Sequence, residues 1–151
     1  MVLRNRFRCV AGLCISVIAT LAMAQTTADR EIVPSGKLRV GINGANATLY
    51  ARAADGGAGG IAADIGKFIA EKLGVPFEPL VYSGAATYTA SFGKGEWDII
   101  VTVAFAVSTA KGWSPAAKTR LTQLVNEAKA AGIVHKAIEK YGLKGVRAAP
   151  E

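Results

Sequence analysis

Segments with the periodicity of strands alternate with segments with the periodicity of helices through the middle of this chain. Residues 38–43, 77–82 and 98–103 are apolar runs of strand length, and the last is apolar at nearly every position. Residues 61–73 and 85–93, which separate them, carry apolar side chains at helical spacing. Short connections between such elements require right-handed crossovers, so the three strands run parallel. The sequence therefore predicts an α/β fold, a three-layer sandwich with a mainly parallel sheet in the strand order 2-1-3.

The two helices between these strands have defined inward faces. The first has an apolar face that consists of Ile61, Ile65, Phe68, Ile69 and Leu73. Gly74 is the expected end of this helix. In the shorter helix we expect Tyr88 and Phe92 to point inward. Residues 44–60, which include the run DGGAGG, predict a loop or a tight hairpin.

Two more helices are predicted near the C-terminus. Ser114 is the expected N-cap of the first and Pro115 its first residue. The helix ends at Gly132, and its apolar stripe consists of Leu121, Leu124, Val125 and Ala128. The second helix ends at Gly142, and its inward residues are Val134, Ile138 and Tyr141.

The first 24 residues have the three parts of a secretory signal peptide. The start is basic, with Arg4, Arg6 and Arg8. An apolar core follows at 10–21, and Ala22-Met23-Ala24 is a small-x-small cleavage site. The core is shorter than the roughly 20 residues of a membrane-spanning helix, which disfavours an uncleaved anchor. Because Leu13 precedes Cys14 where a lipoprotein signal needs a small residue, we expect a soluble periplasmic protein that begins near Gln25.

The remainder of the chain predicts one modest lobe. We expect a flexible leader over residues 25–36, because this stretch is polar and ends in Pro-Ser-Gly. The lobe spans 37–145, with a βαβαβ part at 37–103 and a helical part at 104–145, and a tail follows at 146–151. Both cysteines precede residue 25, so no disulfide stabilises the lobe.

Charged and catalytic residues exclude several classes of function. The lysines near the C-terminus are typical of a solvated helix face rather than a nucleic-acid surface: Lys129, Lys136, Lys140 and Lys144. His135 is the only histidine and has no neighbouring metal ligand or nucleophile, so we expect a surface residue, no metal and no cofactor. Gly41-x-Asn43-Gly44 follows a strand as in a dinucleotide-binding loop, but a loop rather than a helix comes next. The sequence therefore predicts neither an enzyme nor a nucleotide-binding protein.

Small polar residues stand where the predicted strands end. In open α/β sheets, ligands bind outside the carboxyl ends of the strands. We therefore expect a ligand-binding half-site for a small polar solute, formed by Asn43, Asn46, Ser83 and Thr102. The alternative interpretation is that these are ordinary turn residues, because Asn, Ser and Gly favour turns.

Several segments resemble the first lobe of the family 3 extracellular solute-binding proteins, the amino-acid-binding components of ABC importers. They are the runs GKLRVGI at 36–42, GIAADI at 60–65, EKLGV at 71–75 and GEWDI at 95–99. Residues 111–133 and the run IEKYG at 138–142 are similar to the closing helices of that family. The resemblance implies a single periplasmic-binding-protein-like lobe, a small polar ligand such as an amino acid, and an ABC transporter permease as partner.

Two parts that this resemblance implies have no counterpart. No arginine lies between Arg52 and Arg120, so the family's carboxylate-binding arginine is missing, and so is the segment that forms the second lobe. The chain is therefore predicted to be internally truncated. Residues 99–107 contain no Gly, Pro, Asn or Asp, which argues against a tight hairpin. We expect the outgoing and returning strands to be fused near Val103–Ala104, with an unpaired edge that invites self-association.

Three functions follow from this interpretation. The preferred one is the periplasmic substrate-binding component of an amino-acid ABC importer, with weak or lost binding because one lobe cannot close around a solute. The first alternative is an exported interaction module or dimerising remnant. The second is a cyclohexadienyl dehydratase-like enzyme on the same scaffold, although the strand ends supply no acid-base residue.

Overall fold

A four-stranded sheet organises the molecule. The computed structural model describes residues 25–102, 107–109 and 112–148. The strand order is β4-β1-β5-β6, with bounds β1 Leu38–Asn43, β4 Phe77–Tyr82, β5 Ile99–Val101 and β6 Val107–Thr109. β1 pairs in parallel with both β4 and β5, which confirms the predicted order of the three parallel strands. β6 adds an antiparallel strand, so the fold is α/β with a mainly parallel sheet.

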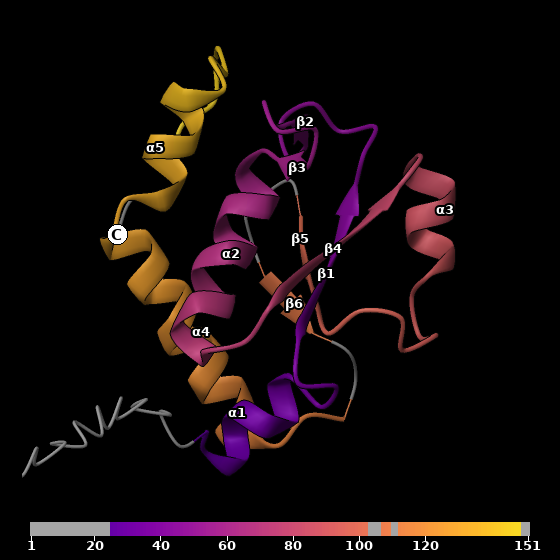
Figure 1. The fold of residues 1–151 in the computed structure, drawn as a ribbon, viewed down its shortest axis with the longest axis vertical. Coiled ribbons are helices and arrows are strands. Elements are labelled where there is room, and N and C mark those ends of the chain that lie inside the picture. The colour runs from indigo at the N-terminus through magenta and orange to yellow at the C-terminus, as the bar shows by residue number, and fades with distance from the viewer. Residues whose placement is uncertain (1–24, 103–106, 110–111, 149–151) are drawn as a thin grey trace, which may run out of the picture.

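Helices lie on both faces of this sheet, as the three-layer prediction requires (Figure 1). α2 (Ile61–Leu73) packs on one face against β1 and β4, and α4 (Pro115–Ala130) and α5 (Ile133–Lys140) pack against α2. The short α3 (Ala85–Ala90) lies on the opposite face. α2 has the predicted bounds, and Gly74 ends it in the left-handed conformation with φ of 65°.

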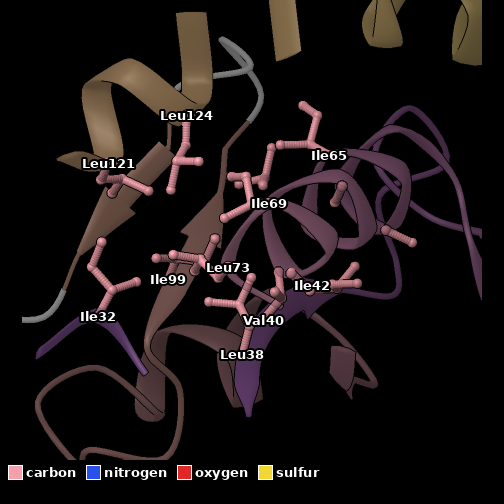
Figure 2. Packing of buried hydrophobic residues seen from close by; sticks show 14 of the residues in the cluster. Ile32, Leu38, Val40, Ile42, Ile65, Ile69, Leu73, Ile99, Leu121 and Leu124 are labelled. Atoms are coloured by element: carbon pink, nitrogen blue, oxygen red, sulfur yellow. The ribbon is translucent and has the colours of Figure 1, made fainter. Parts of the chain in front are cut away.

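The main core fills the space between the sheet and α2 (Figure 2). It includes Leu38, Val40, Ile42, Ile65, Ile69, Leu73, Ile99, Leu121 and Leu124. Gly66 allows this close packing, because a Cβ there would lie only 2.6 Å from the Phe77 ring. α2 therefore packs closely on the sheet for two reasons: its inner face is apolar, and Gly66 has no side chain that would hold the two apart.

A smaller apolar cluster lies under α3 on the other face, with Tyr88, Trp97 and Ile100 as its buried members. Tyr88 points inward as predicted. The inward placement predicted for Phe92 was wrong, since its side chain is 47% exposed. α3 ends at Ala90, so Phe92 follows the helix and contacts the rings of Tyr88 and Trp97 edge-on from outside.

The expected fusion of the outgoing and returning strands was also wrong. β5 and β6 pair antiparallel, with Ile99 opposite Thr109 and Val101 opposite Val107. The connection between them is residues 102–106, and Val103–Ala104 lie outside the described part of the chain. A connection of this length does not need the glycine or asparagine of a two-residue turn, which is why the argument from composition failed.

The segment predicted as a flexible leader contains a docked helix, α1 (Thr27–Ile32). Thr26 and Asp29 form a capping box that begins it. Ile32 is fully buried, and Arg120 of α4 donates to Asp29 at 2.9 Å. The Ser114 hydroxyl donates to Glu31 at 2.6 Å. These two hydrogen bonds join residues more than 80 positions apart, so the polar composition of the segment alone could not predict them.

The remaining predicted elements are present. A two-stranded hairpin of β2 (Ala51–Arg52) and β3 (Ala58–Gly59) lies within the 44–60 segment. Ser114 caps α4 by accepting from the Ala117 N–H at 3.2 Å, and Pro115 begins the helix. Within the residues that the structure describes, no helix is both long and apolar enough to cross a membrane.

Candidate functional site

The carboxyl ends of the three parallel strands meet at one edge of the sheet. Asn43 ends β1 directly beside Tyr82 at the end of β4, and the Gly44 N–H donates to the Tyr82 carbonyl at 2.8 Å. Ser83 follows β4, and Thr102 follows β5. The sheet therefore brings Asn43, Ser83 and Thr102 to the same edge, as the sequence predicted.

The two asparagines shape the turn that leaves β1. The Asn43 Oδ1 atom accepts from the Ala45 N–H at 3.1 Å, and the Asn46 Oδ1 atom accepts from the Thr48 N–H at 3.0 Å. The Asn46 N–H in turn donates to the Asn43 carbonyl at 3.1 Å, so the two residues belong to one turn. Both asparagines thus have the turn-forming role of the alternative interpretation.

This use of the side chains leaves their amide donors available. Each Oδ1 atom is engaged by a backbone N–H, whereas neither Nδ2 group donates to an acceptor among the described residues. The turn holds Asn43 and Asn46 at half-buried positions. The turn-forming and ligand-binding interpretations of these asparagines are therefore compatible, because they use different atoms.

Gly44 presses this turn against the end of β4. A Cβ at that position would lie 2.8 Å from the Tyr82 carbonyl oxygen and 2.8 Å from the Val81 side chain. Any larger residue would displace the turn and both asparagines. The glycine is therefore part of what positions the site.

Ser83 belongs to the start of α3. Its hydroxyl lies 3.4 Å from the Thr87 hydroxyl, which accepts from the Gly84 N–H at 3.2 Å. Ser83 is exposed, and Thr102 is half-buried. The hydroxyl of Ser83 is accordingly both a part of the helix start and accessible from solvent.

Tyr82 is a residue of this edge that the sequence analysis did not single out. It is the register partner of Asn43 and lies on the α3 face, where its ring contacts Tyr88 at 5.9 Å between centroids. Its hydroxyl donates to Glu96 at 2.8 Å, and burial raises its pKa above the usual value. The signal was present in the alternation of 77–82, which places Tyr82 on the same face as Leu80.

The segments that end or follow the strands at this edge contain no charged residue, although the Glu96 carboxylate contacts the Tyr82 hydroxyl. Residues 41–51, 79–93 and 99–109 contain no Asp, Glu, Lys or Arg. Among the described residues no group of three His, Cys, Asp or Glu is placed to hold a metal ion. His135 is exposed on α5, the surface position that the sequence predicted. The arrangement can therefore offer neutral hydrogen bonds and aromatic contact to a solute.

An ion pair with a buried carboxylate, Arg39 with Asp98, lies at the opposite end of the strands. The Asp98 carboxylate is almost fully buried and accepts from the Arg39 N–H at 2.8 Å and from its Nη2 at 2.6 Å. This contact raises the pKa of Arg39 further above its usual value. Arg39 also donates to the Gly95 carbonyl at 2.9 Å. These bonds join the beginnings of β1 and β5, so the pair is structural.

A shallow groove between α2 and α5 has a volume of about 290 Å³. It is lined by Asp64, Lys67, Phe68, Glu71, Ile133, Lys136 and Lys140. Its three lysines are engaged by the protein itself, since Lys67 and Lys136 donate to backbone carbonyls and Lys140 pairs with Asp64. The groove is therefore a weaker candidate than the strand-end edge.

Comparisons with known proteins give partial similarities. No protein-family model matches the chain, and no curated protein matches it either. Among solved structures, the chain is similar to an ancestral cyclohexadienyl dehydratase, with 31% identity and a TM-score of 0.42 over 52% of this chain and 32% of that one. It is also similar to an ancestral cationic amino acid solute binding protein, with 24% identity and a TM-score of 0.41 over 62% of this chain and 37% of that one.

A third similar structure is a point mutant of the arginine-bound form of domain 1 from TmArgBP. The identity is 17% and the TM-score 0.49, over 72% of this chain and 96% of that one. The chain thus spans about a third of the length of the two ancestral proteins and nearly the whole of this isolated domain.

Proposed function

We propose that this chain binds a small polar solute of the amino-acid type at the carboxyl edge of its parallel strands. The observation that carries the proposal is the turn after β1, beside the ends of β4 and β5, where the Nδ2 groups of Asn43 and Asn46 donate to no acceptor within the described part of the chain. Amide N–H groups are suitable donors for the carboxylate oxygens of such a solute. Tyr82, the register partner of Asn43, is half-buried, and its ring offers an apolar surface for the side chain of the solute.

The binding that we propose is weak. The segments at this edge contain no cation that could pair with a carboxylate, so the charge-assisted hydrogen bonds that strengthen such recognition are missing. The donors also come from one side of the solute only, which leaves its other side in water. We therefore expect a dissociation constant on the order of 1 mM, or about −4 kcal/mol.

We further propose that the chain is a binding protein of an ABC importer and not an enzyme. The resemblance of its sequence segments to the family 3 solute-binding proteins supports the importer role. The strand-end segments themselves hold no histidine, carboxylate or lysine, and Glu96, the carboxylate that contacts Tyr82, already accepts from its hydroxyl at 2.8 Å, which supports binding without catalysis.

Titration with a panel of amino acids, followed by NMR chemical shifts, tests this function. We expect saturable shifts at residues 43–46, 83 and 102 with at least one member of the panel. Asn43→Asp keeps the Oδ1 acceptor of the turn but replaces the donor with a negative charge, so it should abolish the shifts without unfolding the chain. Asn126→Asp introduces the same charge on the exposed face of α4 and serves as the matched control.

Two results would refute the proposal. One is a panel that produces no saturable shifts at this edge. The other is an equal loss of binding in Asn43→Asp and Asn126→Asp, because a general effect of charge would then explain both variants.

A further inference from the structure

β4 forms one outer edge of the sheet. It is the terminal strand in the order β4-β1-β5-β6, so among the described strands only β1 pairs with it. Its sequence FEPLVY is rich in large apolar residues, and the Val81 side chain is 42% exposed. An edge strand of this composition is a template for pairing with a strand of another molecule.

The hydrogen bonds at both ends of β4 show which of its residues face outward. The Leu38 N–H donates to the Pro76 carbonyl at 2.9 Å, and the Gly44 N–H donates to the Tyr82 carbonyl at 2.8 Å. In a parallel ladder, every second residue of a strand turns its N–H and C=O toward the same neighbour. The backbone N–H and C=O groups of the even-numbered residues of β4 therefore point toward β1. The backbone groups of Phe77, Pro79 and Val81 point toward the outer edge.

Pro79 is the middle residue of this outward set. Proline has no N–H, so the outer edge lacks its central donor, and the proline ring occupies that position. At residue 78 or 80 a proline would instead remove a hydrogen bond to β1. The position of Pro79 therefore leaves the β1–β4 pairing intact and weakens only the outer edge.

We propose that Pro79 prevents a second copy of this chain from adding its β4 edge to this sheet. Two β4 edges related by a two-fold axis would pair antiparallel, and each would lack the same central donor. Two hydrogen bonds of the shared ladder would then be missing, and one carbonyl on each copy would lose its partner. The apolar edge thus remains unpaired because one backbone group is absent.

Sedimentation velocity over a concentration series tests this inference on the purified chain. Pro79→Val restores the N–H and keeps a β-branched side chain, so we expect the self-association constant to rise at least about tenfold over that of the original chain. The double variant Pro79→Val with Val81→Pro removes the donor again at the next outward position. We expect it to associate no more strongly than the original chain.

Circular dichroism and thermal unfolding establish that each variant is folded. If Pro79→Val does not fold, Pro79→Ala restores the same N–H with a smaller side chain and replaces it in the comparison. An unchanged association constant in the folded single variant would overturn the inference. Equal association of the single and double variants would overturn it as well, since the copies would then meet through another surface.

Discussion

Replacing the buried carboxylate of Asp98 with the isosteric amide, Asp98→Asn, tests what joins the beginnings of β1 and β5. The carboxylate accepts three hydrogen bonds from Arg39, at 2.8 Å from the backbone N–H, 2.6 Å from Nη2 and 3.3 Å from Nε. An asparagine keeps one acceptor oxygen but loses the charge and the second acceptor. Hydrogen bonds to charged groups contribute roughly 1.5–3 kcal/mol each.

The Arg39 side chain is 23% exposed, so water compensates part of this loss. We therefore expect the free energy of unfolding to fall by about 2–3 kcal/mol. For a chain of this length the melting temperature should then decrease by about 10 °C. Urea denaturation and thermal scans at neutral pH measure both quantities.

Glu127→Gln is the matched control for this experiment. Glu127 lies 3.6 Å from Lys72 and 3.9 Å from Arg120, and its side chain is 44% exposed. Removing the charge of such a surface pair should cost less than about 1 kcal/mol. If Asp98→Asn changes the stability no more than Glu127→Gln does, the buried pair does not stabilise the sheet and the reasoning fails.

Three further predictions concern α1, the turn after β1 and the cluster under α3. Burial raises the pKa of Asp29, but hydrogen bonds from Arg120 and Thr26 outweigh this and keep it below the usual value. The stability that this carboxylate contributes is therefore present above the ordinary carboxyl pKa of roughly 4 and is lost as the pH falls through the lowered pKa. Asp29→Asn should accordingly flatten the acid limb of a curve of unfolding free energy against pH. Gly44→Ala should cost about 1–3 kcal/mol in urea denaturation, because the added Cβ meets the Tyr82 carbonyl; an unchanged midpoint would contradict this. Trp97→Phe removes a buried 2.8 Å hydrogen bond to Ser91 and should cost about 1–2 kcal/mol in the same assay, with retained stability as the opposing result.

Local signals in the sequence predicted most of the elements correctly. The 3.6-residue apolar period and Gly74 define α2, and Ser114 with Pro115 defines the start of α4. These signals depend on residues within one or two turns of each other, so no distant contact is needed to recognise them. The parallel order of β4, β1 and β5 followed from the short crossovers alone.

Long-range contacts decided the parts that the sequence analysis missed. α1 is docked because Arg120 and Ser114 donate hydrogen bonds to its acidic residues. The sequence of the polar segment does not indicate those partners. β5 pairs with β6 although the absence of Gly, Pro, Asn and Asp from residues 99–107 had argued against a hairpin there. Phe92 is exposed because α3 ends two residues before it.

For the candidate site too, local sequence predicted one part and tertiary contacts decided the other. By itself, the sequence determined that Asn43, Ser83 and Thr102 follow the three parallel strands, because strand ends can be located from local pattern and crossovers bring them to one edge. Only the tertiary structure showed that the turn uses the asparagine Oδ1 atoms, that their Nδ2 groups donate to no acceptor among the residues described, and that Tyr82 is the register partner of Asn43. The physical reason is that a hydrogen bond forms only between groups that lie close together in space, and the position of a residue in the chain does not specify which groups those are.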